Sequence, residues 1–485
     1  MIALSIKEKQ LQHAKMQIEQ ANKNDPVDMI EIRIDSLQNP YEYTDLLKKT
    51  HKPIILTCRP EREGGEWKES EEERILILKN MLEQPVQYVD IESDTFSKLS
   101  ATLLPKYSYT KIICSFHDFQ SVPNNLEDKV QYINQLPCDI VKFAVLPAKI
   151  SDNLRVLDCI KKITKPCIAI AMGEIGEMSR ILALAYGAFM TFAAIEKGKE
   201  SAPGQLPASE LAELYRIKSV NKGTEIYGVC GNPIAHSLSP LLHNSAFKKY
   251  NINAVYLKWK VDELNCFLQQ TAIPLNVKGL SITIPHKEAA FTLAQSSSEF
   301  AKQTLVANTL TRTSETTFSA DNFDAVAAYE VCMEALKSRA KSYRVLLIGA
   351  GGTAQSLAYI FTTNNHSVEI YNRTYSRAKR LANDCGAIAV DKIITERYDL
   401  IINATSVGMY PNINESPLEG YHFHKHQVVF DVVYNPRDTK LLTQAIHDGA
   451  IGVSGIEMLI RQAALQFQRW TGIFPLDVMK QAVYG

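Results

Sequence analysis

The sequence predicts an α/β protein built from an N-terminal (β/α)8 barrel and two further α/β domains, the last of them doubly wound. Three observations support this fold class. The chain has 485 residues, enough for more than one hydrophobic core. Its first 210 or so residues alternate short β-rich apolar runs with helical stretches. From residue 344 onward, a strand leads into a Gly-rich loop and a helix.

Eight apolar runs in the first part of the chain predict parallel strands. They show little polar–apolar alternation, which is typical of strands buried on both faces. The segment 71–83 predicts a crossover helix, and a last helix is expected at 208–219, opened by Pro207 and Ser209. The expected strands are 2–6, 28–34, 53–59, 87–92, 111–116, 139–145, 167–172 and 189–194.

A polar, Gly-containing break at 219–224 separates the barrel from the second half of the chain. Two sets of strands follow, and a C-terminal amphipathic helix at 456–470 is expected to fold back on the middle domain. The middle domain is expected to contain strands 225–230, 255–260, 279–284, 306–311 and 316–320. The last domain is expected to contain strands 345–349, 368–372, 387–390, 399–403, 428–433 and 450–453.

Composition excludes several classes of function. Lys plus Arg and Asp plus Glu are both 53, so the net charge of zero argues against nucleic acid or an anionic membrane as the main partner. Nine scattered cysteines without a Cys-x-x-Cys pair indicate reduced thiols, and no zinc-ligand spacing is present. The N-terminus has no signal-peptide pattern, and the longest apolar run, 181–195, is too short to span a bilayer. We therefore expect a cytoplasmic protein.

Polar residues gather at the ends of the predicted barrel strands. Active sites of such barrels lie at the carboxyl ends of the strands, so this clustering also predicts a site. The polar residues are Glu31, Arg33, Arg59, Glu63, His117, Lys142 and Arg180, and the aromatic Phe192 lies in the eighth predicted strand.

Lys142 is the most informative of these residues, because it lies within an apolar strand. Desolvation disfavours the charged amine, and a neutral amine can form a Schiff base with a ketone. His117 offers a general base that Glu63 could orient, and the three arginines offer bidentate binding of a carboxylate. Taken singly, each residue has a structural alternative, such as a snorkelling lysine or a surface Arg59–Glu63 ion pair. Only the joint arrangement favours catalysis.

Six motifs in residues 1–215 resemble type I 3-dehydroquinate dehydratase. They are EIRID at 31–35, CRPEREGGE at 58–66, SFHDF at 115–119, VKFAVLP at 141–147, MGEIGEMSR at 172–180 and ESAPGQ at 200–205. The resemblance implies Lys142 as the Schiff-base lysine, His117 as the acid/base and Glu63 as its support. It implies a pocket formed by Glu31, Arg33, Arg59, Met172, Arg180, Phe192, Ser201, Ala202 and Gln205.

This chain departs from the dehydratase pattern in two places. Ile170 stands where many relatives carry a second Met, which should change packing only. The segment EKGKE before SAPGQ is about two residues longer than in single-domain relatives, which affects the loop expected to close over the site.

A second chemical cluster begins at VLLIGAGGTA, residues 345–354. A strand, a Gly-rich turn and a helix in this order predict a dinucleotide site, with the pyrophosphate at the helix N-terminus. The next strand ends in Asn372, Arg373 and Thr374, with Arg377 one turn later. Arginine there suits a 2′-phosphate, so NADP is favoured over NAD. A surface pair of basic residues at a helix start is the structural alternative.

Further motifs across 225–485 resemble shikimate dehydrogenase. They are YGVCGNPIAHSLSPLLHN at 227–244, GLSITIPHKE at 279–288, VANTL at 306–310, DNFDAVA at 321–327, NATSVGM at 403–409 and DVVYNP at 431–436. The resemblance implies Lys287 and Asp324 as the catalytic pair. The implied substrate-binding residues are Ser237, Ser239, Thr283, Asn308, Tyr434 and Gln462. The implied cofactor-binding residues are Gly349, Ala350, Gly351, Gly352, Thr353, Ala354, Asn372, Arg373, Thr374, Arg377, Thr405, Ser406 and Met409.

One substitution departs from the dehydrogenase pattern. The family usually has Asn-Thr-Asp where this chain has Asn322, Phe323 and Asp324, so a hydroxyl is lost beside the catalytic aspartate. The alternating histidines His422, His424 and His426 lie in a polar loop, and no second ligand cluster accompanies them. We therefore expect no metal.

The two resemblances together imply a bifunctional enzyme of the shikimate pathway, leading toward chorismate and the aromatic amino acids. The barrel, 1–219, would convert 3-dehydroquinate to 3-dehydroshikimate. A substrate domain at 224–330, completed by about 456–485, and a Rossmann domain at 331–455 would reduce this product to shikimate with NADPH. The partners are then small molecules, and the sequence leaves the oligomeric state open.

Two alternative functions stand beside this one. A dehydrogenase half that also uses quinate, or prefers NAD, remains open, although Arg373 and Arg377 argue against NAD. A non-enzymatic regulator should have lost some of Lys142, His117, Lys287 and Asp324, and all four are present.

Overall fold

The computed structural model describes residues 1–23, 26–103, 110–337 and 340–485. The chain divides into two compact units. One comprises Met1–Gly228, Pro233–Pro240 and Asn251–Val277, and the other comprises Val229–Asn232, Leu241–Tyr250 and Lys278–Gly485. No helix within the described ranges is both long and apolar enough to cross a membrane.

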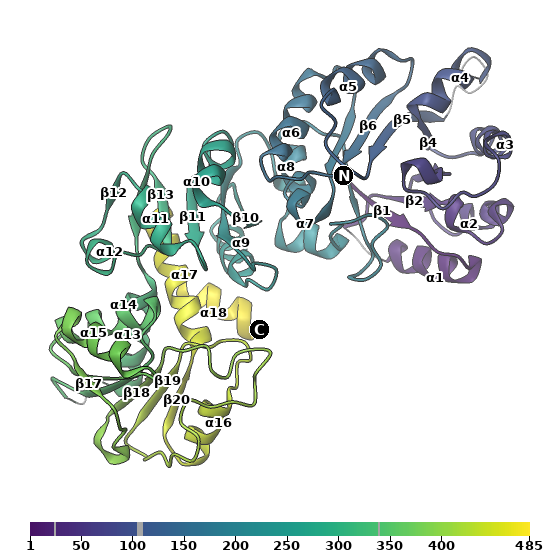
Figure 1. The fold of residues 1–485 in the computed structure, drawn as a ribbon. Helices are drawn as coiled ribbons and strands as arrows, with labels where there is room; N and C mark the ends of the chain where they lie inside the picture. Colours follow the sequence, from purple (N-terminus) through teal and green to yellow (C-terminus); the bar gives the residue numbers. More distant parts are fainter. Residues whose placement is uncertain (24–25, 104–109, 338–339) are drawn as a thin grey trace. The chain divides into compact units, whose positions relative to one another are not determined.

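The first eight strands form one parallel sheet with the order β7-β6-β5-β4-β3-β2-β1-β8. The Phe189 N–H donates to the carbonyl of Cys167 at 2.7 Å, which links the chain just before β8 to β7 and nearly closes the sheet. The strands are β1 (Ile2–Ile6), β2 (Met29–Arg33), β3 (Ile54–Thr57), β4 (Tyr88–Glu92), β5 (Lys111–Asp118), β6 (Ile140–Val145), β7 (Cys167–Ala171) and β8 (Thr191–Ala193). The predicted barrel is confirmed (Figure 1).

Helices surround the barrel strands (Figure 1). They are α1 (Leu11–Asn22), α2 (Thr44–Leu47), α3 (Glu71–Leu82), α4 (Ser93–Leu103), α5 (Leu126–Gln135), α6 (Asp152–Lys162), α7 (Gly173–Gly176) and α8 (Ser179–Ala185). The predicted helix at 71–83 is present, and Ser70 caps it by accepting a hydrogen bond from the Glu73 N–H. The predicted last helix at 208–219 is interrupted. A π-helical turn at Glu210–Leu214 ends before Arg216, whose φ of 49° is left-handed, and a 3-10 turn follows at Ile217–Ser219.

The middle strands form a six-stranded sheet with the order β10-β9-β11-β13-β14-β12. The sequence pattern missed β12, because two residues are too short for any periodicity. The strands are β9 (Glu225–Gly231), β10 (Ala254–Lys260), β11 (Gly279–Ile282), β12 (Ser296–Ser297), β13 (Thr309–Arg312) and β14 (Phe318–Asp321). The helices are α9 (Ser239–Lys249), α10 (Leu264–Phe267), α11 (Lys287–Leu293), α12 (Glu299–Thr304) and α13 (Asp324–Leu336).

The last sheet is parallel and has the order β17-β16-β15-β18-β19-β20, as expected for a doubly wound domain. The strand order reverses at β15, so its carboxyl end lies at the topological switch point where such folds bind ligands. The strands are β15 (Arg344–Ile348), β16 (Ser367–Tyr371), β17 (Ile388–Val390), β18 (Leu400–Asn403), β19 (Val428–Asp431) and β20 (Ile451–Ser454). The helices are α14 (Gly352–Thr363), α15 (Tyr375–Cys385) and α16 (Lys440–His447).

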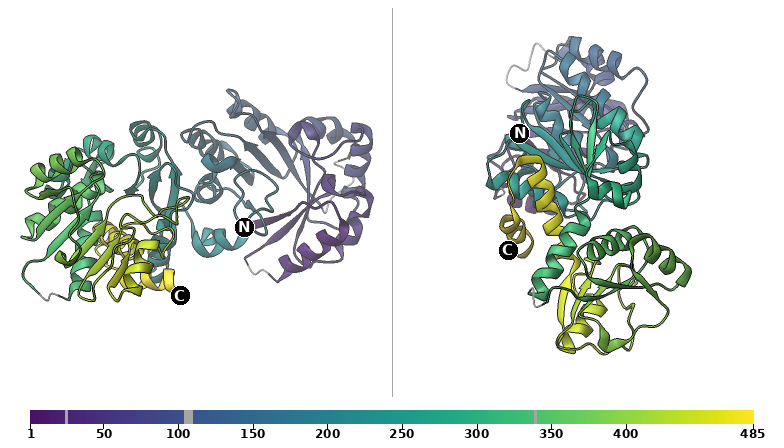
Figure 2. Two further views of the ribbon diagram at one scale, coloured as in Figure 1. Left: turned by 60° about the horizontal axis from the view of Figure 1, so that its bottom comes forward. Right: turned by 90° about the vertical axis from the view of Figure 1, so that its left-hand side faces the viewer.

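The chain ends in α17 (Gly455–Thr471) and α18 (Leu476–Tyr484). Helix α17 packs against α13 (Figure 2). It also contacts the middle sheet, since the side-chain amide of Gln466 donates to the Thr309 hydroxyl at 2.9 Å and accepts from the Ser281 hydroxyl at 2.7 Å. The C-terminal helix therefore returns to the middle strands.

Candidate functional site

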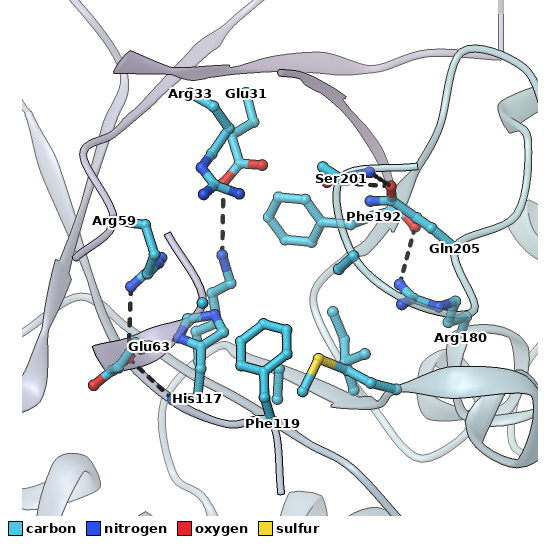
Figure 3. Close-up of a pocket in the computed structure, with 16 residues that line it drawn as sticks. Glu31, Arg33, Arg59, Glu63, His117, Phe119, Arg180, Phe192, Ser201 and Gln205 are labelled. Carbon is cyan, nitrogen blue, oxygen red and sulfur yellow. Dashed lines mark hydrogen bonds and ion pairs between the residues drawn. The ribbon is translucent and has the colours of Figure 1, made fainter. Parts of the chain in front are cut away.

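A cavity lies at the carboxyl ends of the barrel strands, and every barrel residue proposed for the site lines it. Figure 3 shows charged side chains from β2, from the segment after β3 and from β5 on one side, opposite Phe192, Arg180, Ser201 and Gln205. The lining residues are Glu31, Arg33, Arg59, Glu63, Gly64, His117, Phe119, Lys142, Ala144, Ile170, Met172, Arg180, Phe192, Ser201, Ala202 and Gln205.

Lys142 lies in the interior of β6 and is 4% exposed. Its amine contacts the Asp90 carboxylate at 2.7 Å and lies 3.7 Å from the Glu31 carboxylate. The amine also lies 4.2 Å from the centre of the Phe192 ring. The lysine is buried, as expected. Its position is fixed by an ion pair as well as by apolar contacts.

A buried ionic network supports the floor of the cavity. Arg59 pairs with Asp90 at 2.7 Å and with Glu92 at 2.5 Å, and Arg74 pairs with Glu92 at 2.6 Å. Burial alone would raise the pKa of Asp90, but the positive charges of Arg59 and Lys142 hold it below its ordinary value. Sequence reasoning missed Asp90 and Glu92. Their signal was the strand YVDIE, in which two acidic residues spaced by two share one face of a buried strand.

His117 and Glu63 form a buried pair. The Glu63 carboxylate lies 2.9 Å from Nδ1 of His117 and accepts its backbone N–H at 3.1 Å. Burial lowers the pKa of His117 well below its ordinary value, and the charges of Arg59 and Lys142 lower it further. Burial also raises the pKa of Glu63 to about 8, although Arg59 acts in the opposite direction. A neutral imidazole with a fixed orientation suits proton abstraction.

The three arginines differ in what they contact. Arg33 makes two hydrogen bonds to Asp35, at 2.9 and 2.7 Å, and Arg59 belongs to the ionic network. Arg180 donates instead to the carbonyls of Phe192 and Pro203, at 3.4 and 3.0 Å. Its Nε has no hydrogen-bond partner within the described part of the chain, and burial lowers its pKa to about 10. Arg180 therefore retains the most capacity to bind an anion.

The loop after β8 closes one side of the cavity. The side-chain carbonyl of Gln205 accepts from the backbone N–H of Ser201 at 2.8 Å, and the Gly173 N–H donates to Pro203 at 3.0 Å. A Cβ at Gly204, where φ is +70°, would lie 2.2 Å from the carbonyl oxygen of Gly173. The loop thus packs directly on the backbone that follows β7.

A second cluster lies in the other unit. The Lys287 amine contacts Asp324 at 2.5 Å, and the Asn308 side chain donates to Asp324 at 2.9 Å. The same Asn308 amide approaches Gln462 of α17 at 3.2 Å. Burial raises the pKa of Tyr434, whereas the nearby charge of Lys287 lowers it. The structure therefore brings Lys287, Asp324, Asn308, Gln462 and Tyr434 into one neighbourhood.

The backbone beside Asp324 is held by hydrogen bonds even though this chain has Phe323 where the family usually has threonine. The Phe323 N–H donates to Asn308 at 2.9 Å, and the Asp324 N–H donates to Asn322 at 3.3 Å. Thr283 follows β11 and is half-buried. Ser237 and Ser239 belong to the first unit, where the Ser239 N–H donates to the Ser237 hydroxyl at 3.3 Å, and their role stays a prediction.

The Gly-rich turn after β15 fits a dinucleotide. Gly349 has a φ of +119° and packs against Ala404 and Thr405, so a side chain there would be strained. Gly351 and Gly352 face open space, which leaves the start of α14 accessible to a pyrophosphate. The turn continues through Ala350, Thr353 and the buried Ala354.

The turn after β16 places basic residues at the surface. Arg373 and Arg377 are exposed, and the Asn372 side chain shapes this turn by donating to the Thr374 carbonyl at 2.9 Å. After β18, the Thr405 hydroxyl donates to Asn403 at 2.7 Å. Ser406 and the exposed Met409 follow in the same turn. Within the described ranges, no group of three or more His, Cys, Asp or Glu residues is placed to hold a metal ion.

Family models match nearly the whole chain. Residues 2–222 match type I 3-dehydroquinase, and residues 229–310 match the shikimate dehydrogenase substrate binding domain. Residues 331–451 match shikimate/quinate 5-dehydrogenase, and residues 455–484 match the shikimate 5′-dehydrogenase C-terminal domain.

Individual relatives agree with these matches. The bifunctional 3-dehydroquinate dehydratase/shikimate dehydrogenase, chloroplastic, of Arabidopsis thaliana is 37% identical over 470 residues, which cover 92% of this chain and 78% of the relative. Shikimate dehydrogenase (NADP(+)) of Methanopyrus kandleri is 37% identical over 282 residues, which cover 55% of this chain and 97% of the relative. The solved shikimate 5-dehydrogenase of Thermus thermophilus in complex with NADP(H) and shikimate is 30% identical, with a TM-score of 0.50, over 53% of this chain and 98% of that chain.

Proposed function

The chain belongs to the family of bifunctional 3-dehydroquinate dehydratase/shikimate dehydrogenases, and we propose from this membership which residues carry each reaction. It is a lyase in its N-terminal half and an NADP-dependent oxidoreductase in its C-terminal half. The observation that carries the assignment of residues is the pairing of each buried or half-buried lysine with an acidic partner.

In the barrel, the Lys142 amine attacks the ketone carbon of 3-dehydroquinate, and loss of water leaves an imine. His117 removes a proton from the carbon next to the imine carbon, and its orientation depends on Glu63. The same imidazole then gives the proton to the departing hydroxyl, so that water leaves. Hydrolysis of the imine releases 3-dehydroshikimate and restores Lys142.

Arg180 binds the substrate carboxylate in this scheme, because Arg33 and Arg59 already pair with acidic residues. Glu31 lies close to the Lys142 amine. Ser201, Ala202 and Gln205 cover the substrate from the loop, and Met172 and Phe192 supply the apolar wall.

In the C-terminal half, Lys287 stabilises the negative charge that develops on the ketone oxygen of 3-dehydroshikimate and then donates the proton. Asp324 holds the lysine at 2.5 Å, and Asn308 holds the aspartate. NADPH supplies the hydride when bound. Thr283, Asn308 and Gln462 bind ring hydroxyls, and Tyr434 borders the carboxylate.

The dehydrogenase half uses NADP(H). We assign the pyrophosphate to the Gly349–Ala354 turn and the 2′-phosphate to Arg373 and Arg377, with Asn372 and Thr374 shaping that turn. Thr405, Ser406 and Met409 would lie near the cofactor. The matched ranges support a barrel at 1–219, a substrate domain at 224–330 completed by 456–485, and a Rossmann domain at 331–455.

The partners in this proposal are small molecules, and neither nucleic acid nor a membrane is needed. All nine cysteines are free thiols, which supports a reducing compartment such as the cytoplasm.

Crossed variants of the full chain test the two sites. With 3-dehydroquinate and NADPH, the wild-type chain should form shikimate with loss of NADPH absorbance. Lys142→Ala should consume NADPH only when 3-dehydroshikimate is supplied, because its dehydrogenase site is intact. Lys287→Ala should form 3-dehydroshikimate without consuming NADPH. Formation of shikimate by Lys142→Ala from 3-dehydroquinate would contradict the assignment.

The dehydratase should depend on pH through Glu63. The carboxylate form of Glu63 accepts the Nδ1–H of His117 more strongly than the protonated form and makes Nε2 the stronger base, and the carboxylate fraction grows as the pH rises through about 8. We therefore predict that dehydratase turnover increases up to that pH. In Glu63→Gln, the amide oxygen accepts at every pH, so this increase should disappear. The exposed Glu61→Gln is the matched control, and an unchanged profile in Glu63→Gln would refute the role.

Arg373 should select the phosphorylated cofactor. Arg373→Ala should raise the KM for NADPH about 10- to 100-fold, which corresponds to the loss of one charge-assisted hydrogen bond. Turnover with NADH should stay unchanged. Lys379→Ala, on helix α15 that follows this turn, controls for a general loss of positive charge. Equal effects of the two substitutions on the KM for NADPH would count against a specific contact.

A further inference from the structure

The segment after β7, residues 172–180, is packed against strand β10. This strand follows the barrel in sequence but belongs to the same compact unit as the barrel. The 172–180 segment carries two residues that line the dehydratase cavity, Met172 and Arg180. Its position therefore sets where Arg180 presents its guanidinium.

One contact between the segment and β10 is buried. The indole N–H of Trp259 lies 3.2 Å from the sulfur of Met178, and both side chains are almost fully buried. A Cβ at Gly228 would lie 2.4 Å from the Trp259 ring, so the neighbouring strand leaves space for this side chain only because it has glycine there. Trp259 is thereby fixed against Met178, two residues before Arg180.

A second contact is ionic. The Lys258 amine lies 3.4 Å from the Glu177 carboxylate, and their side chains are 19% and 12% exposed. Burial and the nearby charge of Glu177 raise the pKa of Tyr215. Burial raises the pKa of Glu177, whereas Lys258 lowers it, so the lysine favours the charged carboxylate.

Glu177 is coupled to Arg180 through the backbone. The Arg180 N–H donates to the Glu177 carbonyl at 3.1 Å, so the two residues lie on one turn. The Arg180 Nε lacks a hydrogen-bond partner among the described residues, and its side chain is held only by two carbonyls. A shift of this turn would therefore move Arg180 with little to oppose it.

We propose that Lys258, from the strand that follows the barrel, is a positioning residue of the dehydratase: it holds Glu177 and, through that turn, places Arg180 against the substrate carboxylate. This inference rests on the proposed role of Arg180. It means that the barrel site is completed by a residue outside residues 1–219.

Strand β10 also contains a residue, Lys260, whose substitution serves as a control for Lys258→Ala. Lys260, two residues later, pairs with Glu174 at 2.9 Å, but both side chains are exposed and neither belongs to the turn of Arg180. Lys260→Ala therefore removes one positive charge and one ion pair to the 172–180 segment, as Lys258→Ala does, but it leaves Glu177 paired.

The test measures both activities of the full chain in Lys258→Ala, Lys258→Arg and Lys260→Ala. Lys258→Ala should raise the dehydratase KM for 3-dehydroquinate about fivefold, the upper value for a partly exposed ion pair, with kcat changed less than about twofold. Lys258→Arg should restore the KM. Lys260→Ala should leave it unchanged, and dehydrogenase turnover should stay constant in all three.

Several results would overturn the proposal. They are a dehydratase KM that stays constant or falls in Lys258→Ala, an equal rise in Lys260→Ala, or a parallel loss of both activities that indicates general destabilisation. An inactive wild-type dehydratase would refute the proposed function itself. If the wild-type dehydratase is active but the KM for 3-dehydroquinate is the same in Lys258→Ala, only this inference is refuted.

Discussion

The dehydratase site depends on one buried carboxylate, that of Asp90. Removing a charge from water is expensive unless a partner compensates it, and Asp90 has two, Arg59 and Lys142. This pairing holds Lys142 beside Phe192 and keeps Arg59 directed toward the floor of the cavity. The catalytic amine is therefore placed by electrostatics within a framework of parallel strands, and the strand register brings the partners together.

Both sites pair a lysine with an acidic residue, but the two pairs differ in how deeply they are buried. Lys142 and Asp90 are nearly inaccessible, with side chains 5% and 0% exposed, whereas Lys287 and Asp324 are 29% and 17% exposed. A nearly enclosed site suits an imine that must not hydrolyse before the elimination is complete. A more open lysine suits a proton donor that acts on a substrate and cofactor that must enter and leave.

Motifs and strand ends predicted both folds and the members of both clusters, because catalytic groups at the ends of parallel strands converge on one edge. They could not predict partners that depend on the pairing of distant strands. Asp90 and Glu92, whose partner Arg59 follows another strand, were missed for this reason. The pairing of Arg33 with Asp35 is local, two residues apart, but the motif does not show that Asp35 occupies the guanidinium group. The contact of Lys258 with Glu177 joins segments far apart in sequence, which no local pattern encodes.

The most direct test of the central role of Asp90 is borohydride trapping of the imine in the Asp90→Asn variant of the full chain. With 3-dehydroquinate and borohydride, the wild-type chain should gain mass on the peptide that contains Lys142. Asp90→Asn should gain it at least about tenfold more slowly, the equivalent of one lost charge-assisted hydrogen bond, while dehydrogenase turnover and circular dichroism stay unchanged. Labelling of Lys142 at the wild-type rate in this variant would contradict the account.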